Sequence, residues 1–136
     1  MRYASDNAGA LNLYFCTRHT RIALERMETG GRNVQGHLRH VVLRLEREVR
    51  AFNNSLGSHW YQRLRREDEH DAIMGPINIY RCAGYACVAL QRFDTGGSNV
   101  LSPLRKCLFR LERELVQIEK QLGPRWRKRL HRGKYS

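Results

Sequence analysis

Apolar residues recur every three or four positions in two segments of the chain, which is the pattern of an amphipathic helix. The first stripe consists of Leu13, Cys16, Thr20, Ala23, Leu24 and Met27, and the second of Ile79, Cys82, Ala86, Ala89, Leu90 and Phe93. We expect these helices to begin at the N-caps Asn12 and Asn78 and to stop at the glycine pair that follows each stripe. Apolar residues also alternate at 11–15 and 77–81, so a strand is the alternative there.

A longer apolar stripe follows each of these segments and predicts a helix of about 18 residues. The helices are expected to start near Gly36 and Ser102, with Pro103 at the first helical position, and to end at Gly57 and Gly123. The stripes are formed by Leu38, Val42, Leu45, Val49, Phe52 and Leu56, and by Leu104, Leu108, Leu111, Leu115, Ile118 and Leu122.

The chain matches itself without a gap when it is shifted by 66 residues. Residues 9–66 then lie over 75–132, and 25 of the 58 pairs are identical, about 43 %. We interpret this match as a tandem duplication, in which each copy is one structural unit. Each unit consists of a helical hairpin and a short third helix, at 59–66 and 125–132. The remaining segments are an acidic linker, 67–74, and a basic tail, 133–136.

One hairpin alone exposes a wide apolar face on each of its long helices. Two hairpins packed face to face bury these faces and place four long helices around one core. The fold prediction is therefore an all-α, co-folded domain, a bundle whose halves are related by a pseudo-twofold axis. The sequence leaves open whether the halves pack within one chain or swap between chains, and hence whether the protein is a monomer or a homodimer.

The chain is strongly basic, with 25 Lys and Arg against 13 Asp and Glu and a formal charge of +12. Of these cations 21 are Arg, the better bidentate ligand of phosphate, although a GC-rich coding sequence also enriches Arg. No apolar run reaches the length of a membrane span, and the first residues lack the pattern of a secretory signal. We therefore expect an intracellular protein, cytoplasmic or nuclear, that does not insert into a membrane.

The cysteines and histidines form no repeated metal-binding motif. Cys16 and His19 have C-x₂-H spacing and Cys82 and Cys87 have C-x₄-C spacing, but neither spacing recurs in the other copy. A zinc site converging from three helices is the alternative; we favour free thiols packed as small apolar groups. No cofactor is expected.

Carboxylates are few, and we predict no enzyme activity. Glu46 with Arg50, and Glu48 with Arg44, have the i,i+4 spacing of ion pairs on a helix surface. The repeated Thr-Gly-Gly-x-Asn-Val sequence lacks the lysine of a phosphate loop, so it is interpreted as a helix stop and restart, with anion binding as the alternative.

The functional hypothesis depends on two sets of basic residues. One set forms rows of Arg along the long second helices, and the other lies in the short third helices. In the third-helix segments Arg is interleaved with Trp and Tyr, which is typical of phosphate contact and base stacking. The alternative is that each Trp packs its third helix on the core. The predicted nucleic-acid-binding residues are Arg39, Arg44, Arg47, Arg50, Arg63, Arg66, Arg105, Lys106, Arg110, Arg113, Arg125, Arg127, Lys128, Arg129 and Arg132. The competing interpretation is a solvated surface with intrahelical ion pairs.

We therefore predict a non-catalytic nucleic-acid-binding protein that reads mainly phosphates and binds largely without sequence preference. Rows of Arg on rigid helices suit a duplex, and duplex RNA is favoured over DNA. By analogy of architecture alone, some four-helix suppressors of RNA silencing from insect viruses bind such duplexes. A helix-turn-helix contact with DNA is an alternative. The alternative of another class is a protein-interaction module whose basic face docks an acidic partner.

Overall fold

The computed structural model describes residues 7–67 and 75–128, and every regular element in those ranges is a helix. In chain order these are α1 (Asn7–Thr29), α2 (Val34–Leu56), α3 (Trp60–Glu67), α4 (Pro76–Asp94) and α5 (Leu101–Leu122). The backbone at 126–128 is also helical. The all-α prediction is confirmed. The alternative strands at 11–15 and 77–81 are wrong, because these segments lie inside α1 and α4.

Several predicted helix boundaries need correction. Asn12 and Asn78 are not N-caps, because they lie inside α1 and α4 and are buried there. Pro103 is the third residue of α5 rather than the first, and Glu67 belongs to α3 rather than to the linker. The other linker residues and the basic tail lie outside the described residues.

The two long hairpins turn through the same glycine geometry. Gly30 and Gly96 have φ of 75° and 69°, a left-handed conformation that glycine adopts without a steric penalty. The next glycine amide closes the helix end: Gly31 donates to the Arg26 carbonyl at 2.7 Å and Gly97 to the Arg92 carbonyl at 2.7 Å, as in a Schellman motif. These amides are thus engaged in the turn, which favours a helix stop over an anion-binding loop.

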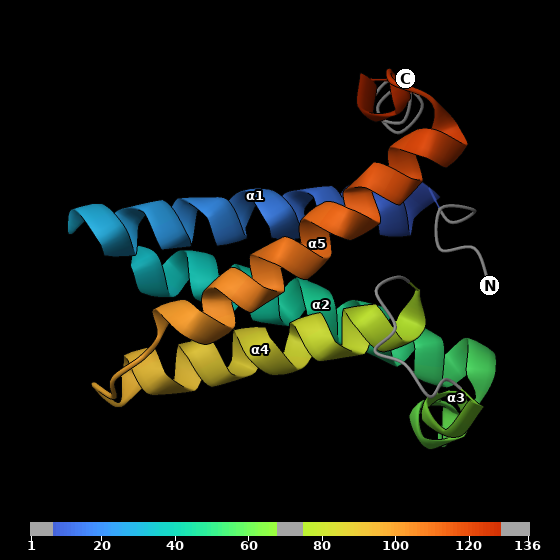
Figure 1. Cartoon of the computed structure of the whole chain (residues 1–136), viewed down its shortest axis with the longest axis horizontal. Coiled ribbons are helices and arrows are strands. Elements are labelled where there is room, and N and C mark those ends of the chain that lie inside the picture. The colour runs from blue at the N-terminus through green and yellow to red at the C-terminus, as the bar shows by residue number, and fades with distance from the viewer. Residues whose placement is uncertain (1–6, 68–74, 129–136) are drawn as a thin grey trace.

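The long helices form a closed ring around the core. Extensive packing joins α1 with α2, α2 with α4, α4 with α5, and α5 with α1. Each hairpin therefore packs against both helices of the other hairpin, and α2 and α5 lie diagonally across the bundle (Figure 1). The short α3 packs mainly against α4.

The predicted apolar stripes form the core. Leu13, Leu38, Leu45, Leu104 and Leu111 are completely buried. Two tryptophans close one end of the core, where Trp60 and Trp126 are 1 % and 4 % exposed. Because these indoles are buried, they hold α3 and the 126–128 turn against the bundle rather than offering stacking surfaces. None of the described helices is both long and apolar enough to cross a membrane.

Candidate nucleic-acid interface

Most of the predicted phosphate-binding side chains are exposed. Those on α2 and α5 are Arg39, Arg47, Arg50, Arg105, Lys106 and Arg113, and those on or beside the short third helices are Arg63, Arg125, Arg127 and Lys128. The side chain of Arg66 lies outside the described part of the chain, as do Arg129 and Arg132.

The structure separates these cations into two faces. Because α2 and α5 are diagonal in the ring, their outward surfaces lie on opposite sides of the bundle. We name the α5 face for Arg105, Lys106, Phe109 and Arg113, and the α2 face for Arg39, His40, Leu43 and Arg47. The two arginine rows therefore form separate faces rather than one continuous surface.

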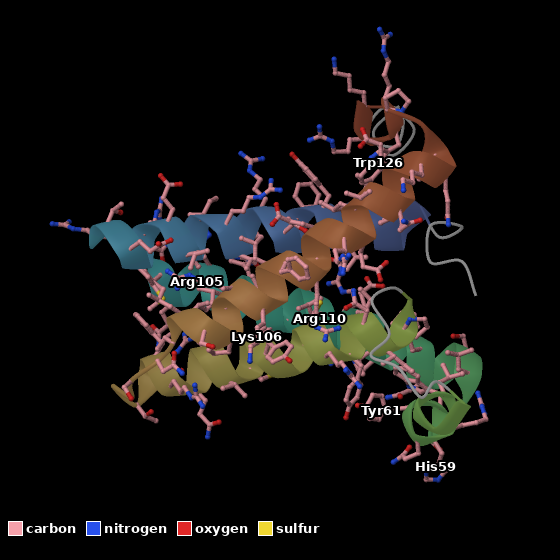
Figure 2. All side chains as sticks on the ribbon, in the orientation of Figure 1. His59, Tyr61, Arg105, Lys106, Arg110 and Trp126 are labelled. Carbon is pink, nitrogen blue, oxygen red and sulfur yellow. The ribbon has the colours of Figure 1, made fainter. Side chains whose placement is uncertain are left out.

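The α5 face combines cations with an exposed aromatic ring. Phe109 is 59 % exposed, and the Arg113 guanidinium lies 5.0 Å from its ring centroid. On the flank toward α4, the Lys106 ammonium lies 5.7 Å from the ring centroid of Tyr85. Figure 2 shows Arg105 and Lys106 following the N-terminal half of α5 on the near side of the molecule. An exposed aromatic ring on a row of cations can contact a base or sugar next to phosphates.

The α2 face has an aliphatic residue at the corresponding place. Leu43, 66 residues before Phe109, is 62 % exposed. Instead of Lys106 it has His40, whose ring stacks on that of His19 with centroids 4.8 Å apart. The α2 face is therefore cationic and apolar, and its aromatic ring is the imidazole of His40, which stacks on His19.

Two of the predicted cations are held in the bundle interior. Arg44 donates through Nη1 to Oδ1 of Asn12 at 2.9 Å, and Arg110 donates in the same way to Asn78 at 2.9 Å. Both arginines are half-buried, and Arg44 also lies 5.1 Å from the Phe15 ring centroid. Their geometry is that of groups joining α1 to α2 and α4 to α5, with only part of each side chain left for a phosphate.

Glu48 and Glu114 end the repeated sequence Arg-Leu-Glu-Arg-Glu at 44–48 and 110–114. Both carboxylates are buried, which corrects the prediction of a surface ion pair for Glu48. Glu48 is 6 % exposed and Glu114 is 2 % exposed. Glu114 accepts hydrogen bonds from the backbone amide of Gly75 at 2.6 Å and from the side-chain amide of Asn78 at 3.1 Å. Its pKa rises to about 7 because burial outweighs these two hydrogen bonds. A carboxyl group in this position is half-protonated near neutral pH.

Between described residues, the surface ion pairs join different helices rather than turns of one helix. Arg21 of α1 lies 2.7 Å from Glu112 of α5, and Arg105 of α5 lies 3.2 Å from Glu28 of α1. All four side chains are about half exposed, so each pair contributes less than about 1 kcal/mol. Arg105 is consequently available to exchange its carboxylate partner for a phosphate.

Three histidines cluster beside the α2 face. His19 and His37 approach through their Nδ1 atoms at 2.9 Å, and Nε2 of His37 lies 3.1 Å from Nη1 of Arg26. The Nδ1 contact needs one neutral acceptor nitrogen. Burial and the neighbouring cations lower the pKa of His19 to about 4 and lower that of His37 as well. His19 and His37 are therefore uncharged at neutral pH.

One cation that follows α5, Arg127, contacts an aromatic ring of α1. Arg127 lies 4.6 Å from the ring centroid of Tyr14, and the ring of Tyr14 meets that of Trp126 edge to face at 6.3 Å. The contacts of Tyr14 with Trp126 and Arg127 hold residues 126–128 against α1.

The thiols are free, and three of them are buried. Burial raises the pKa of Cys16 and of Cys82 well above the usual range, so these groups are protonated. Within the described ranges, no three His, Cys, Asp or Glu side chains converge as ligands of a metal ion.

Sequence reasoning missed Phe109 and Tyr85 as part of the basic surface. A signal was present: Phe109 lies four residues after Arg105 and four before Arg113, which places it in the same row on the helix. No family model matches this chain, and no curated protein or solved structure shows significant similarity to it. The case for function therefore depends on the geometry of the two faces.

Proposed function

We propose that the chain is a non-catalytic nucleic-acid-binding protein that contacts phosphates through its two basic helical faces and favours duplex RNA. The observation that carries this proposal is the outward row of α5, where Arg105, Lys106 and Arg113 are exposed together with the ring of Phe109, and Arg113 lies over that ring. From Arg105 to Arg113 the row spans about 12 Å of rigid helix.

The row supports backbone recognition rather than base readout. Arg and Lys on a fixed helix neutralise successive phosphates and release counterions, which gives affinity without sequence preference. The short length of the row and the single exposed ring favour a few phosphate contacts with one stacking contact at a sugar or an unpaired terminal base.

Two faces on opposite sides imply two ligand sites. We propose that a pseudo-twofold axis relates the halves of the chain, in keeping with the matching contacts of Arg44 with Asn12 and of Arg110 with Asn78. Under this proposal one chain holds two duplex segments, or bends one long duplex around the bundle. Binding of one short duplex per chain would leave the α2 face unused.

The deciding experiment is a titration of nuclease-treated protein with short duplex RNA, duplex DNA and the corresponding single strands at two salt concentrations. We expect the tightest binding for duplex RNA and a steep loss of affinity with salt. The plot of log K against log salt has a negative slope. The triple variant Arg105→Ala, Lys106→Ala, Arg113→Ala should make that slope shallower by about 3.

A matched triple variant controls for net charge. Arg18→Ala, Arg32→Ala and Lys120→Ala remove the same three charges from exposed positions outside the two faces, and this variant should keep most of the affinity. Equal losses for both variants would mean that only overall charge matters. Absence of binding at physiological salt would reject the proposal.

The second candidate is a protein-interaction module, which the exposed Leu43 favours. An aliphatic side chain that is 62 % exposed between Arg39 and Arg47 gains nothing from a phosphate but packs well against an amphipathic acidic helix. Leu43→Ala separates the candidates: it should weaken an acidic helical partner and leave nucleic-acid binding unchanged.

A further inference from the structure

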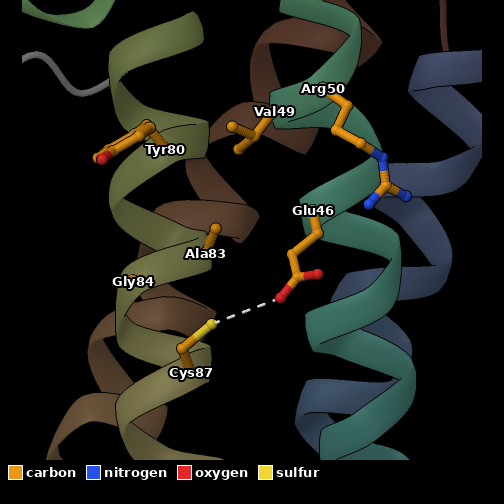
Figure 3. A pocket seen from close by; sticks show the side chains of 7 residues that line it. All are labelled: Glu46, Val49, Arg50, Tyr80, Ala83, Gly84 and Cys87. Atoms are coloured by element: carbon orange, nitrogen blue, oxygen red, sulfur yellow. Dashed lines mark hydrogen bonds between the residues drawn. The ribbon is translucent and has the colours of Figure 1, made fainter. Parts of the chain in front are cut away.

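A cavity of about 330 Å³ lies between α2 and α4. Its walls are mostly apolar, with Val49 on α2 and Tyr80, Ala83 and Gly84 on α4; Figure 3 shows Val49 and Ala83 between the two helices. A side-chain carbon added at Gly84 would meet nothing within 4 Å, so this side of the cavity is open space. The cavity can therefore accept the aliphatic part of a side chain.

One carboxylate, that of Glu46, lines this cavity. Glu46 extends from α2 toward Cys87, whose Sγ lies 3.9 Å from its Oε1 (Figure 3). Arg50 also lines the cavity, but its guanidinium points away from α4. Within the described part of the chain, Glu46 takes part in no ion pair. A thiol is a weak hydrogen-bond donor, so the carboxylate retains most of its capacity to bind a cation.

The other half of the molecule shows what can occupy such a place. Positions 66 apart are Glu46 and Glu112 on the long second helices, and Cys87 and Arg21 on the first helices. Between α1 and α5 the Arg21 guanidinium meets Glu112 at 2.7 Å. Between α4 and α2 the arginine is replaced by Cys87, and Arg18 is replaced by Gly84. The α2–α4 cavity thus keeps the acceptor Glu46 but has Cys87 in place of a counterpart of Arg21.

We propose that the α2–α4 cavity is a binding site for an arginine side chain of a partner protein. The guanidinium would pair with the Glu46 carboxylate in place of the thiol, and its aliphatic stem would pack against Val49 and Ala83. Arginine fits better than lysine because its planar fork donates two parallel hydrogen bonds to one carboxylate. This site is independent of the two basic faces and of the proposed function.

The test uses blocked arginine, N-acetyl-arginine methylamide, as the probe and the uncharged isostere, blocked citrulline, as its control. Amide chemical shifts of the labelled protein are followed by NMR at physiological ionic strength, where charges more than about 8 Å apart are largely screened. We expect saturable shifts around Glu46, Gly84 and Cys87 with a millimolar dissociation constant for arginine, and at least tenfold weaker binding of citrulline.

Substitutions test whether the probe binds at Glu46. Glu46→Gln preserves shape and should abolish the preference for arginine over citrulline, whereas Glu112→Gln should leave it intact. Cys87→Arg supplies the guanidinium within the chain and should block the probe; circular dichroism checks its fold. Equal binding of arginine and citrulline, unsaturable shifts in the natural sequence, or full arginine preference in Glu46→Gln would each overturn the proposal.

Discussion

Asn12 donates through its side-chain amide to the carboxylate of Glu48 at 2.6 Å, deep between α1 and α2. The same amide donates to the Arg44 carbonyl at 2.9 Å. Asn78 contacts Glu114 and the Arg110 carbonyl at 3.1 Å and 3.2 Å between α4 and α5. Each hairpin is thus fastened by one asparagine that satisfies a buried carboxylate and a backbone group together.

Removing that asparagine should destabilise the fold severely. Asn12→Ala leaves the Glu48 carboxylate and the Arg44 guanidinium without their shared partner, and an unsatisfied buried group costs about 1–3 kcal/mol. We expect a loss of roughly 2–4 kcal/mol in urea-induced unfolding. Asn54→Ala, at an exposed site on α2, should change stability by less than about 0.5 kcal/mol. Similar midpoints for both variants would contradict a structural role for the asparagine.

Acid should weaken the α1–α2 hairpin through His19. Its pKa is about 4 in the folded state and about 6.5 when unfolded, so the unfolded chain binds more protons between these values. The contribution is fully present above pH 6.5 and is lost as pH falls through about 4. Because His19 is partly exposed, we expect a loss on the order of 1 kcal/mol. His19→Tyr, the residue found 66 positions later, should remove this dependence in unfolding curves recorded across that range.

Glu114 should give the opposite dependence. Its pKa rises to about 7 in the fold against about 4.3 when unfolded, so the folded chain binds more protons between these values. Its stabilising contribution is full below pH 4.3 and is lost as pH rises through about 7. The buried site makes the effect roughly 2–4 kcal/mol. Stability of Glu114→Gln relative to the natural sequence should therefore increase as pH rises, and a constant difference would refute the assignment.

Thiol labelling should distinguish one cysteine from the other three. Cys87 is exposed, whereas Cys16, Cys82 and Cys107 are buried. Burial and the neighbouring Glu46 carboxylate raise the pKa of Cys87, so its thiolate fraction and labelling rate at neutral pH are low. We expect one slow equivalent of a disulfide reagent to react with the native protein and four to react in denaturant. Glu46→Gln should accelerate the native reaction, and Cys87→Ser should abolish it.

The hydrophobic pattern predicted which face of each helix is buried but not which helix it meets. The stripe through Leu45 and Leu111 and the stops at Gly57 and Gly123 follow from local sequence. The diagonal placement of α2 and α5 does not, because the same stripes can be buried in several orders of packing. For this reason the sequence could list the arginines and could not divide them into two faces.

The buried carboxylates were missed although the sequence contains their signal. Glu48 lies three residues after Leu45 and four before Phe52, which puts it on the apolar stripe. The charged residues on either side of Glu48 favour a surface position instead, which is the position predicted from the sequence. Which asparagine would satisfy it depends on the contact between α1 and α2, and that contact is not encoded in the local pattern of either helix.

The ring of packed helices also constrains how the chain is made. α1 rests against α5, the last long helix to be synthesised, and α2 rests against α4. A ribosome adds about 5–20 residues per second, so the first hairpin waits for seconds with its apolar surfaces open to solvent. During that interval a second nascent chain of the same sequence presents the same complementary surfaces, and polysomes are where exchanged hairpins and aggregates of this protein would first arise.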